Sequence, residues 1–163
     1  MTALDKLSQV LNQVLMWIAG VFLVAMIVLT CSNVFLRIVW MPVKGTFEIM
    51  GFLGAIVTAF ALGYTQIERG HIAVDILIKK FSKKAQRITN SITCLICMVF
   101  FSMAAWQIAK WASTLRKSGE VTETLQIVYY PFTYGVALGC VVLALVFLVD
   151  LMKAIVGEEE KDR

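Results

Sequence analysis

The chain has 163 residues, of which 60% are hydrophobic and 16% are charged, and its mean hydropathy is +0.81. A soluble domain is nearer half apolar and a quarter charged, so the composition excludes an ordinary soluble domain and indicates an integral membrane protein. The long apolar runs do not alternate with polar residues, which excludes a β-barrel and predicts membrane-spanning helices.

Four apolar runs predict a single four-helix membrane domain. The expected spans cover about 14–36, 46–66, 88–112 and 129–152. Residues 1–13 are mildly amphipathic and are expected to form a short helix on the membrane surface. After the third run, helical character is expected to continue to Ser118, with Gly119 as a C-terminal stop.

Residues 75–87, between the second and third spans, have two chemically different sides. Leu77 and Phe81 lie on one side of a helix, and Lys80 and Lys84 lie on another. This pattern predicts an amphipathic helix on an anionic leaflet. The expected fold class is therefore an all-α integral membrane protein, with four transmembrane helices and this amphipathic helix between the second and third.

The basic residues predict the orientation. The termini and the middle loop hold ten of them: Lys6, Arg69, Lys79, Lys80, Lys83, Lys84, Arg87, Lys153, Lys161 and Arg163. The two opposite loops hold five: Arg37, Lys44, Lys110, Arg116 and Lys117. Because basic residues favour the cytoplasmic face, both termini and the amphipathic helix are expected in the cytoplasm. The net charge of +4 follows these membrane edges, so membrane lipids are expected as partners and nucleic acid is not.

Small residues recur every fourth position in the second span. They are Gly51, Ala55, Ala59 and Gly63. Such a stripe lets another helix approach closely, and van der Waals contact then holds the pair. The fourth span carries a second motif of this kind, Gly135-x-x-x-Gly139, which is one candidate mate for the stripe.

Glu48 is the one charged residue between Thr46 and Gln66. Three interpretations of its role are open. It pairs with Arg37 across the outer boundary, it pairs with Lys44 four residues earlier, or it favours the N-terminus of its own helix. In the last case Arg37 extends to lipid phosphate independently.

Metal and haem ligands are sparse. Cys94-x-x-Cys97 has the spacing of a metal or redox pair, but it lies within a span with no other ligand nearby, so apolar packing is the favoured interpretation. The only histidine, His71, belongs to a compact polar turn with Gly70 and Asp75 at the cytoplasmic face, where a structural role is expected. No cofactor and no bound metal are therefore expected.

The spans carry no charge near their centres, and both prolines lie near helix ends. Transport pathways usually hold ionisable groups deep in the membrane, and many secondary transporters have broken helices. The chain alone is therefore not expected to bind and couple an ion, and it is not expected to be an enzyme.

Several segments together resemble a known family. They are Glu48 early in the second span, Phe52-Leu53-Gly54-Ala55, Gly70-His71-Ile72-x-Val74-Asp75, and Thr124-Leu125-Gln126-Ile127 before Tyr129-Tyr130-Pro131. In this respect the chain resembles the small membrane subunit of tripartite ATP-independent periplasmic (TRAP) transporters, the DctQ-like family. Gly45-Thr46-Phe47 departs from it where tryptophan often precedes the glutamate, and Val128 stands where proline is common.

The resemblance implies a multi-pass subunit of the bacterial inner membrane that works with a large multi-span subunit and a periplasmic binding protein. It implies sodium-coupled import of an organic acid, such as a dicarboxylate or sialic acid, with this chain as a scaffold that helps to dock the binding protein. Docking candidates on the periplasmic side are Arg37, Glu48, Arg116, Lys117, Glu120 and Glu123. The small-residue stripe then packs either within this chain or on the large subunit. The alternative function is a small haem- or quinone-linked membrane enzyme subunit.

Overall fold

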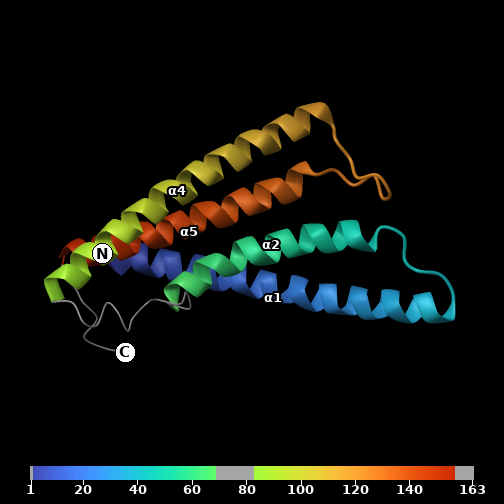
Figure 1. Ribbon diagram of the computed structural model, residues 1–163, viewed down its shortest axis with the longest axis horizontal. Coiled ribbons are helices and arrows are strands. Elements are labelled where there is room, and N and C mark those ends of the chain that lie inside the picture. Colours follow the sequence, from blue (N-terminus) through green and yellow to red (C-terminus); the bar gives the residue numbers. More distant parts are fainter. Residues whose placement is uncertain (1, 69–82, 157–163) are drawn as a thin grey trace.

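The computed structural model describes residues 2–68 and 83–156, which contain four long helices (Figure 1). They are α1 (Thr2–Val39), α2 (Thr46–Ile67), α4 (Lys83–Ser118) and α5 (Tyr130–Val156). Each is long and apolar enough to cross a membrane. The predicted all-α architecture with four transmembrane helices is therefore confirmed.

Two predicted features at the cytoplasmic side fall largely outside this range. The turn of Gly70, His71 and Asp75 lies outside the described residues, as does most of the expected amphipathic helix at 75–87. Its last residues, 83–87, form the beginning of α4.

The first helix is longer than the sequence suggested. Instead of a surface helix followed by a span, α1 is continuous over 38 residues. The expected apolar face is also turned away from the other helices, because Leu7 and Val14 are exposed while Ser8 and Asn12 are buried. Neither glycine nor proline interrupts residues 2–19, so nothing in the sequence ends a helix between the amphipathic segment and the apolar run.

Glycine and proline set the other helix ends. Helix α4 ends at Ser118, and Gly119 follows with φ +68° and donates its N–H to the Leu115 carbonyl oxygen at 3.0 Å. This confirms the predicted glycine stop, since a left-handed residue after a helix is most easily glycine. Pro131 occupies the first turn of α5, where its missing N–H leaves no hydrogen bond unmade.

Helix α5 is the central helix. It packs against α4 on one side and α2 on the other, and α1 packs mainly against α2. In the most apolar stretch of each helix, 44% of α5 is buried, against 28% of α2 and 11% of α1 and α4. Helices α1 and α4 therefore lie at the edges of the array and turn most of their surface outward (Figure 1).

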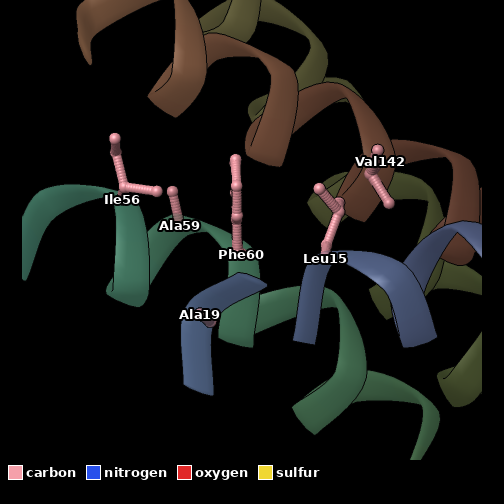
Figure 2. Close-up of a cluster of buried hydrophobic side chains, with 6 residues drawn as sticks. All are labelled: Leu15, Ala19, Ile56, Ala59, Phe60 and Val142. Atoms are coloured by element: carbon pink, nitrogen blue, oxygen red, sulfur yellow. The ribbon is translucent and has the colours of Figure 1, made fainter. Parts of the chain in front are cut away.

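Three helices share the main apolar cluster. Its buried members are Leu15, Ala19, Ile56, Ala59, Phe60 and Val142, gathered from α1, α2 and α5 (Figure 2). A second cluster joins α4 to α5 through Cys94, Leu143 and Phe147. Cys94, the buried cysteine of the Cys94-x-x-Cys97 pair, is thus packed among apolar side chains.

The loops divide the molecule into two ends. We call the end with residues 40–45 and 119–129 the hairpin end, and the end where α1 begins and α5 finishes the terminal end (Figure 1). The distribution of basic residues predicts that the hairpin end faces the periplasm. The candidate functional site lies at this end.

Candidate functional site

Residues 120–129, between α4 and α5, form a compact hairpin closed on Thr122. The Thr122 N–H donates to the Ile127 carbonyl oxygen at 3.0 Å, and the Gln126 N–H donates to the Thr122 carbonyl oxygen at 3.2 Å. The Thr122 hydroxyl accepts the Ile127 N–H at 3.1 Å, and Thr122 is only 2% exposed. Gln126 has φ +54°, which turns the chain back so that Val121 and Val128 pair as an isolated β-bridge.

Glu48 holds the tip of this hairpin from α2. Its Oε1 accepts the Thr124 N–H at 2.8 Å, and its Oε2 accepts the Leu125 N–H at 3.0 Å. Both carboxylate oxygens are therefore used, and hydrogen bonds to an ionised acceptor are stronger than neutral ones. The structure thus gives Glu48 a partner that none of the three sequence interpretations included, namely the backbone of a loop 76 residues further along the chain.

The α1–α2 loop presents Glu48 to the hairpin. The Asn33 side-chain oxygen accepts the Val43 N–H at 2.9 Å, and the buried Thr46 hydroxyl donates to the Val43 carbonyl oxygen at 2.8 Å. Gly45 follows Val43 and Lys44 in the chain, has φ +74°, and immediately precedes the first residue of α2, Thr46. These contacts fix the first turn of α2, and Glu48 lies in that turn.

Gly45 and Leu125 make a second lock beside the carboxylate. A β-carbon at position 45 would overlap the Leu125 side chain, so the hairpin lies directly on the glycine. Glycine is favoured at position 45 for two reasons. A side chain would overlap Leu125, and the positive φ is costly for any residue with a side chain. Both the backbone conformation and the Leu125 contact therefore favour glycine at position 45.

Aromatic rings continue the contact below the carboxylate. Phe52 of α2 stacks on Phe132 of α5 with ring centroids 4.2 Å apart, and it meets Tyr129 edge to face at 5.3 Å. Aromatic pairs of these geometries are favourable beyond their buried area. The hairpin is thus held to α2 by a carboxylate, a leucine–glycine contact and an aromatic group.

The remaining docking candidates lie at the hairpin end of the molecule. Arg37 lies in the last turn of α1, and Arg116 and Lys117 lie in the last turn of α4. Glu120 and Glu123 belong to the hairpin itself, and all five of these side chains are exposed. Glu48 is half-buried and turned to the hairpin backbone, so it positions this surface more than it forms part of it.

The small-residue stripe of α2 divides into two parts. A β-carbon at Gly139 would lie 2.7 Å from the Ala59 carbonyl oxygen, so α2 and α5 meet backbone to backbone there. Gly135 faces the Ile56 side chain, and Gly63 accommodates Asn12 of α1. Toward the hairpin end, Gly51 and Ala55 are exposed, and a β-carbon at Gly51 would meet nothing within 4 Å.

The terminal end holds polar contacts that the sequence did not reveal. Asn12 is fully buried and donates its amide N–H to the Ser8 carbonyl oxygen at 2.9 Å, while its Oδ1 faces Gly63. Gln66 donates to Asp150 Oδ2 at 3.2 Å, which joins α2 to α5. The sequence carries no signal for the burial of Asn12, because its neighbour Gly63 belongs to α2 and only the fold brings the two together.

Comparison with known proteins gives one family. The family model described as tripartite ATP-independent periplasmic transporters, DctQ component, matches residues 26–157. This range includes α2, α4, the hairpin and α5. No curated protein and no solved structure matches the chain.

Proposed function

Because the chain belongs to the DctQ family and is thus a small membrane component of a TRAP transporter, we propose that it is the scaffold subunit of a sodium-coupled organic-acid importer. The family associates with a large membrane subunit and a periplasmic binding protein. In this proposal the large subunit moves a dicarboxylate or sialic acid, while this chain packs against it and offers its hairpin end to the loaded binding protein.

The hairpin held by Glu48 is the observation that carries the docking role. Short loops usually lose conformational freedom when they bind a partner, and that loss weakens binding. Here the Thr124 and Leu125 N–H groups are already bound to Glu48, and Thr122 closes the loop from within. The hairpin is therefore a preformed surface, which suits repeated docking and release of a soluble partner.

The charges around the hairpin support the same role. Arg116 and Lys117 at the end of α4 are followed closely by Glu120 and Glu123, and all four side chains are exposed. Exposed charges contribute little affinity individually, but complementary sets steer encounter and select the correct partner. We propose that these residues, with Arg37, guide the binding protein to the hairpin.

The proposed orientation puts the hairpin end in the periplasm and both termini in the cytoplasm of the inner membrane. Cysteines introduced singly at Ser118 and Lys6, in a background without the native cysteines, test it because both positions are exposed. An impermeant thiol reagent added to intact cells should label Ser118→Cys and leave Lys6→Cys unlabelled. The reverse pattern contradicts the proposal.

Reconstitution into liposomes tests the division of labour. The purified chain alone should move no organic acid, whereas the chain with the large subunit, the binding protein and a sodium gradient should support uptake. Uptake by this chain alone would refute the scaffold role.

Charge reversal tests docking in that reconstituted system. Glu120→Lys combined with Glu123→Lys should reduce uptake most at low concentrations of binding protein, because a saturating partner compensates for weakened encounter. The matched control is Lys6→Glu at the terminal end. Unchanged uptake by the hairpin variant at low binding-protein concentration would place docking elsewhere.

A further inference from the structure

A shallow groove with a volume of about 320 Å³ lies between α4 and α5. Its lining includes Ser102, Ala105, Trp106 and Ala109 of α4 and Val141 and Ala144 of α5. Ala105 and Ala144 are buried and form its floor, whereas Trp106 is 75% exposed and forms part of its wall. Apart from the Ser102 hydroxyl and the Trp106 indole N–H, the side chains of the lining are apolar. The groove therefore fits an occupant that is mostly hydrocarbon.

The line of the groove leads toward the hairpin end, to two polar side chains. On α4, Ser113 and Arg116 follow Ala109 by four and seven residues. On α5, Tyr134 precedes Val141 by seven residues. Residues at these spacings share one face of a helix, so Arg116 and Tyr134 lie on the two faces that form the groove. We call Arg116 and Tyr134 the mouth of the groove; Arg116 is about 10 Å beyond Ala109 along α4.

The two side chains of the mouth lie at the same level of the molecule. The Tyr129 N–H donates to the Glu120 carbonyl oxygen at 3.4 Å, so the end of α4 is level with the beginning of α5. Arg116 is in the last turn of α4 and Tyr134 is in the second turn of α5, and both are exposed. Both positions are close to an end of a helix long and apolar enough to cross a membrane. The mouth is therefore placed where lipid headgroups lie, with the apolar groove beneath it.

The mouth offers hydrogen-bond donors that the described residues leave unused. Within residues 2–68 and 83–156, the Arg116 guanidinium and the Tyr134 hydroxyl have no hydrogen-bond or ion-pair partner. Glu120 and Glu123 of the hairpin therefore do not neutralise Arg116 by direct pairing. A guanidinium presents a planar set of N–H donors that matches phosphate oxygens, and a phenol adds one more donor. A cation and a hydroxyl above an apolar groove complement a phosphate that is carried on a hydrocarbon chain.

We propose that the groove and its mouth bind one anionic phospholipid, with an acyl chain along the alanine floor and the phosphate at Arg116 and Tyr134. An acyl chain needs no polar contact, and the lining offers almost none. A net negative headgroup is favoured over a zwitterionic one because the exposed Lys117 adds a second cation beside Arg116. This chain alone forms the site, so the inference does not rest on the proposed function. Because Arg116 is also a candidate for docking, the tests measure bound lipid and not uptake.

Tryptophan fluorescence measures what occupies the groove. The full chain keeps Trp106, its other three tryptophans, all exposed, are changed to phenylalanine, and it is placed in phosphatidylcholine nanodiscs with a small fraction of phosphatidylglycerol that has brominated acyl chains. Bromine quenches an indole that it contacts, so Trp106 should be quenched as if this lipid were about fivefold enriched beside it. The matched control keeps only Trp17, which is 72% exposed on α1, and should be quenched in proportion to the bulk fraction. Equal quenching of the two tryptophans overturns the proposal.

Substitutions at the mouth test the headgroup contact in the same nanodiscs. Arg116→Gln should remove the enrichment, so that brominated phosphatidylglycerol and brominated phosphatidylcholine quench Trp106 equally, and Tyr134→Phe should reduce it. Arg37→Gln is the matched control, because Arg37 is an exposed arginine in the last turn of α1 at the same end of the molecule. It should keep the full enrichment. Enrichment that survives Arg116→Gln overturns the proposal.

The unmodified chain and the assembled complex give independent measurements. Native mass spectrometry of the full chain purified from cell membranes should show one bound anionic phospholipid, which Arg116→Gln should lose. Bound lipids in the same proportions as the bulk membrane contradict the proposal. In the complex with the large subunit, brominated phosphatidylglycerol should still quench Trp106. Shielding of Trp106 by the large subunit would show that protein occupies the groove, and the proposal would then be wrong.

Discussion

Glu48 and Lys110 are both charged residues within helices long and apolar enough to cross a membrane, but only Glu48 has hydrogen-bond partners within the described residues. Glu48 is half-buried, and both of its carboxylate oxygens accept backbone N–H groups from the hairpin. Lys110 is exposed on α4 beside Trp106, on a helix that packs mainly against α5 alone. The first region is complete within this chain, whereas the Lys110 side chain has no hydrogen-bond or ion-pair partner among the residues that the structure describes.

This difference separates folding from assembly. A change in the complete region should alter the subunit itself, including its yield, its thermal stability or the exchange of its amides. A change at an exposed side chain of α4, such as Lys110, should leave the isolated subunit intact. The complete region can be tested on the subunit alone, with exposed positions as controls.

The largest effect is expected at the contact between α2 and α5. Gly139→Leu would place side-chain atoms where the Ala59 backbone now lies, with a β-carbon only 2.7 Å from its carbonyl oxygen. Backbone cannot move aside as a side chain can, so overpacking should cost about 3 kcal/mol, the upper part of its usual range. We expect a clearly reduced amount of folded subunit in the membrane and a lower unfolding temperature in detergent.

Gly51→Leu is the matched control for that change. A β-carbon at Gly51 would meet nothing within 4 Å, and leucine is the better helix former. The yield of this variant should equal that of the unmodified chain. Equal loss from both substitutions would mean that the stripe is buried along its whole length.

The next effect is expected at the turn before α2. Gly45→Ala should cost about 1–2 kcal/mol for the left-handed backbone, and more because Leu125 must leave its place. Gly119→Ala is the control, since Gly119 has φ +68° but open space around it. A comparison of unfolding temperatures then isolates the Leu125 contact. Identical losses would show that this contact contributes nothing.

The sequence predicted the parts of the fold that depend on local chemistry. Apolar runs of bilayer length predicted the four spans, and Gly119 correctly predicted that α4 ends at Ser118. The partner of Glu48 could not be predicted in this way. Its ligands are backbone N–H groups 76 and 77 positions away, which carry no side-chain signal in the sequence.

The same limit applies to the packing faces. Spacing placed Gly51, Ala55, Ala59 and Gly63 on one stripe. Only the tertiary packing decides that Ala59 meets α5 and Gly63 meets α1, while Gly51 and Ala55 stay exposed. Likewise, composition showed no reason for Asn12 to be buried. Burial of Asn12 follows from Gly63 on the neighbouring helix, and that pairing is a property of the tertiary structure.

A more local effect is expected at Glu48. Glu48→Ala removes both acceptors, so the Thr124 and Leu125 amides should exchange with solvent much faster while the helices remain protected. Glu48→Gln keeps one side-chain oxygen and should protect one of the two amides. Hydrogen exchange of the subunit in detergent measures both. Glu123→Gln, on the exposed side of the hairpin, should change neither amide, and protection that survives Glu48→Ala would show that the hairpin holds itself.

The smallest effect is expected at the aromatic contact that joins α2 to α5. Phe52→Leu retains most of the apolar volume but loses stacking on Phe132 at 4.2 Å and the edge contact with Tyr129 at 5.3 Å. Such pairs contribute about 0.5–1.5 kcal/mol beyond their buried area, and about 1 kcal/mol corresponds to a shift of roughly 2–4 °C in the unfolding temperature of a chain of this size. Phe47→Leu is the matched control, because Phe47 lies five residues earlier on α2 and is 87% exposed. The isolated subunit should lose stability with the first change and keep it with the second, since only Phe52 has its partners within this chain. A loss of the same size from Phe47→Leu would show that Phe47 is buried against another part of the subunit. The contrast between contacts completed within this chain and exposed side chains would then not hold on α2.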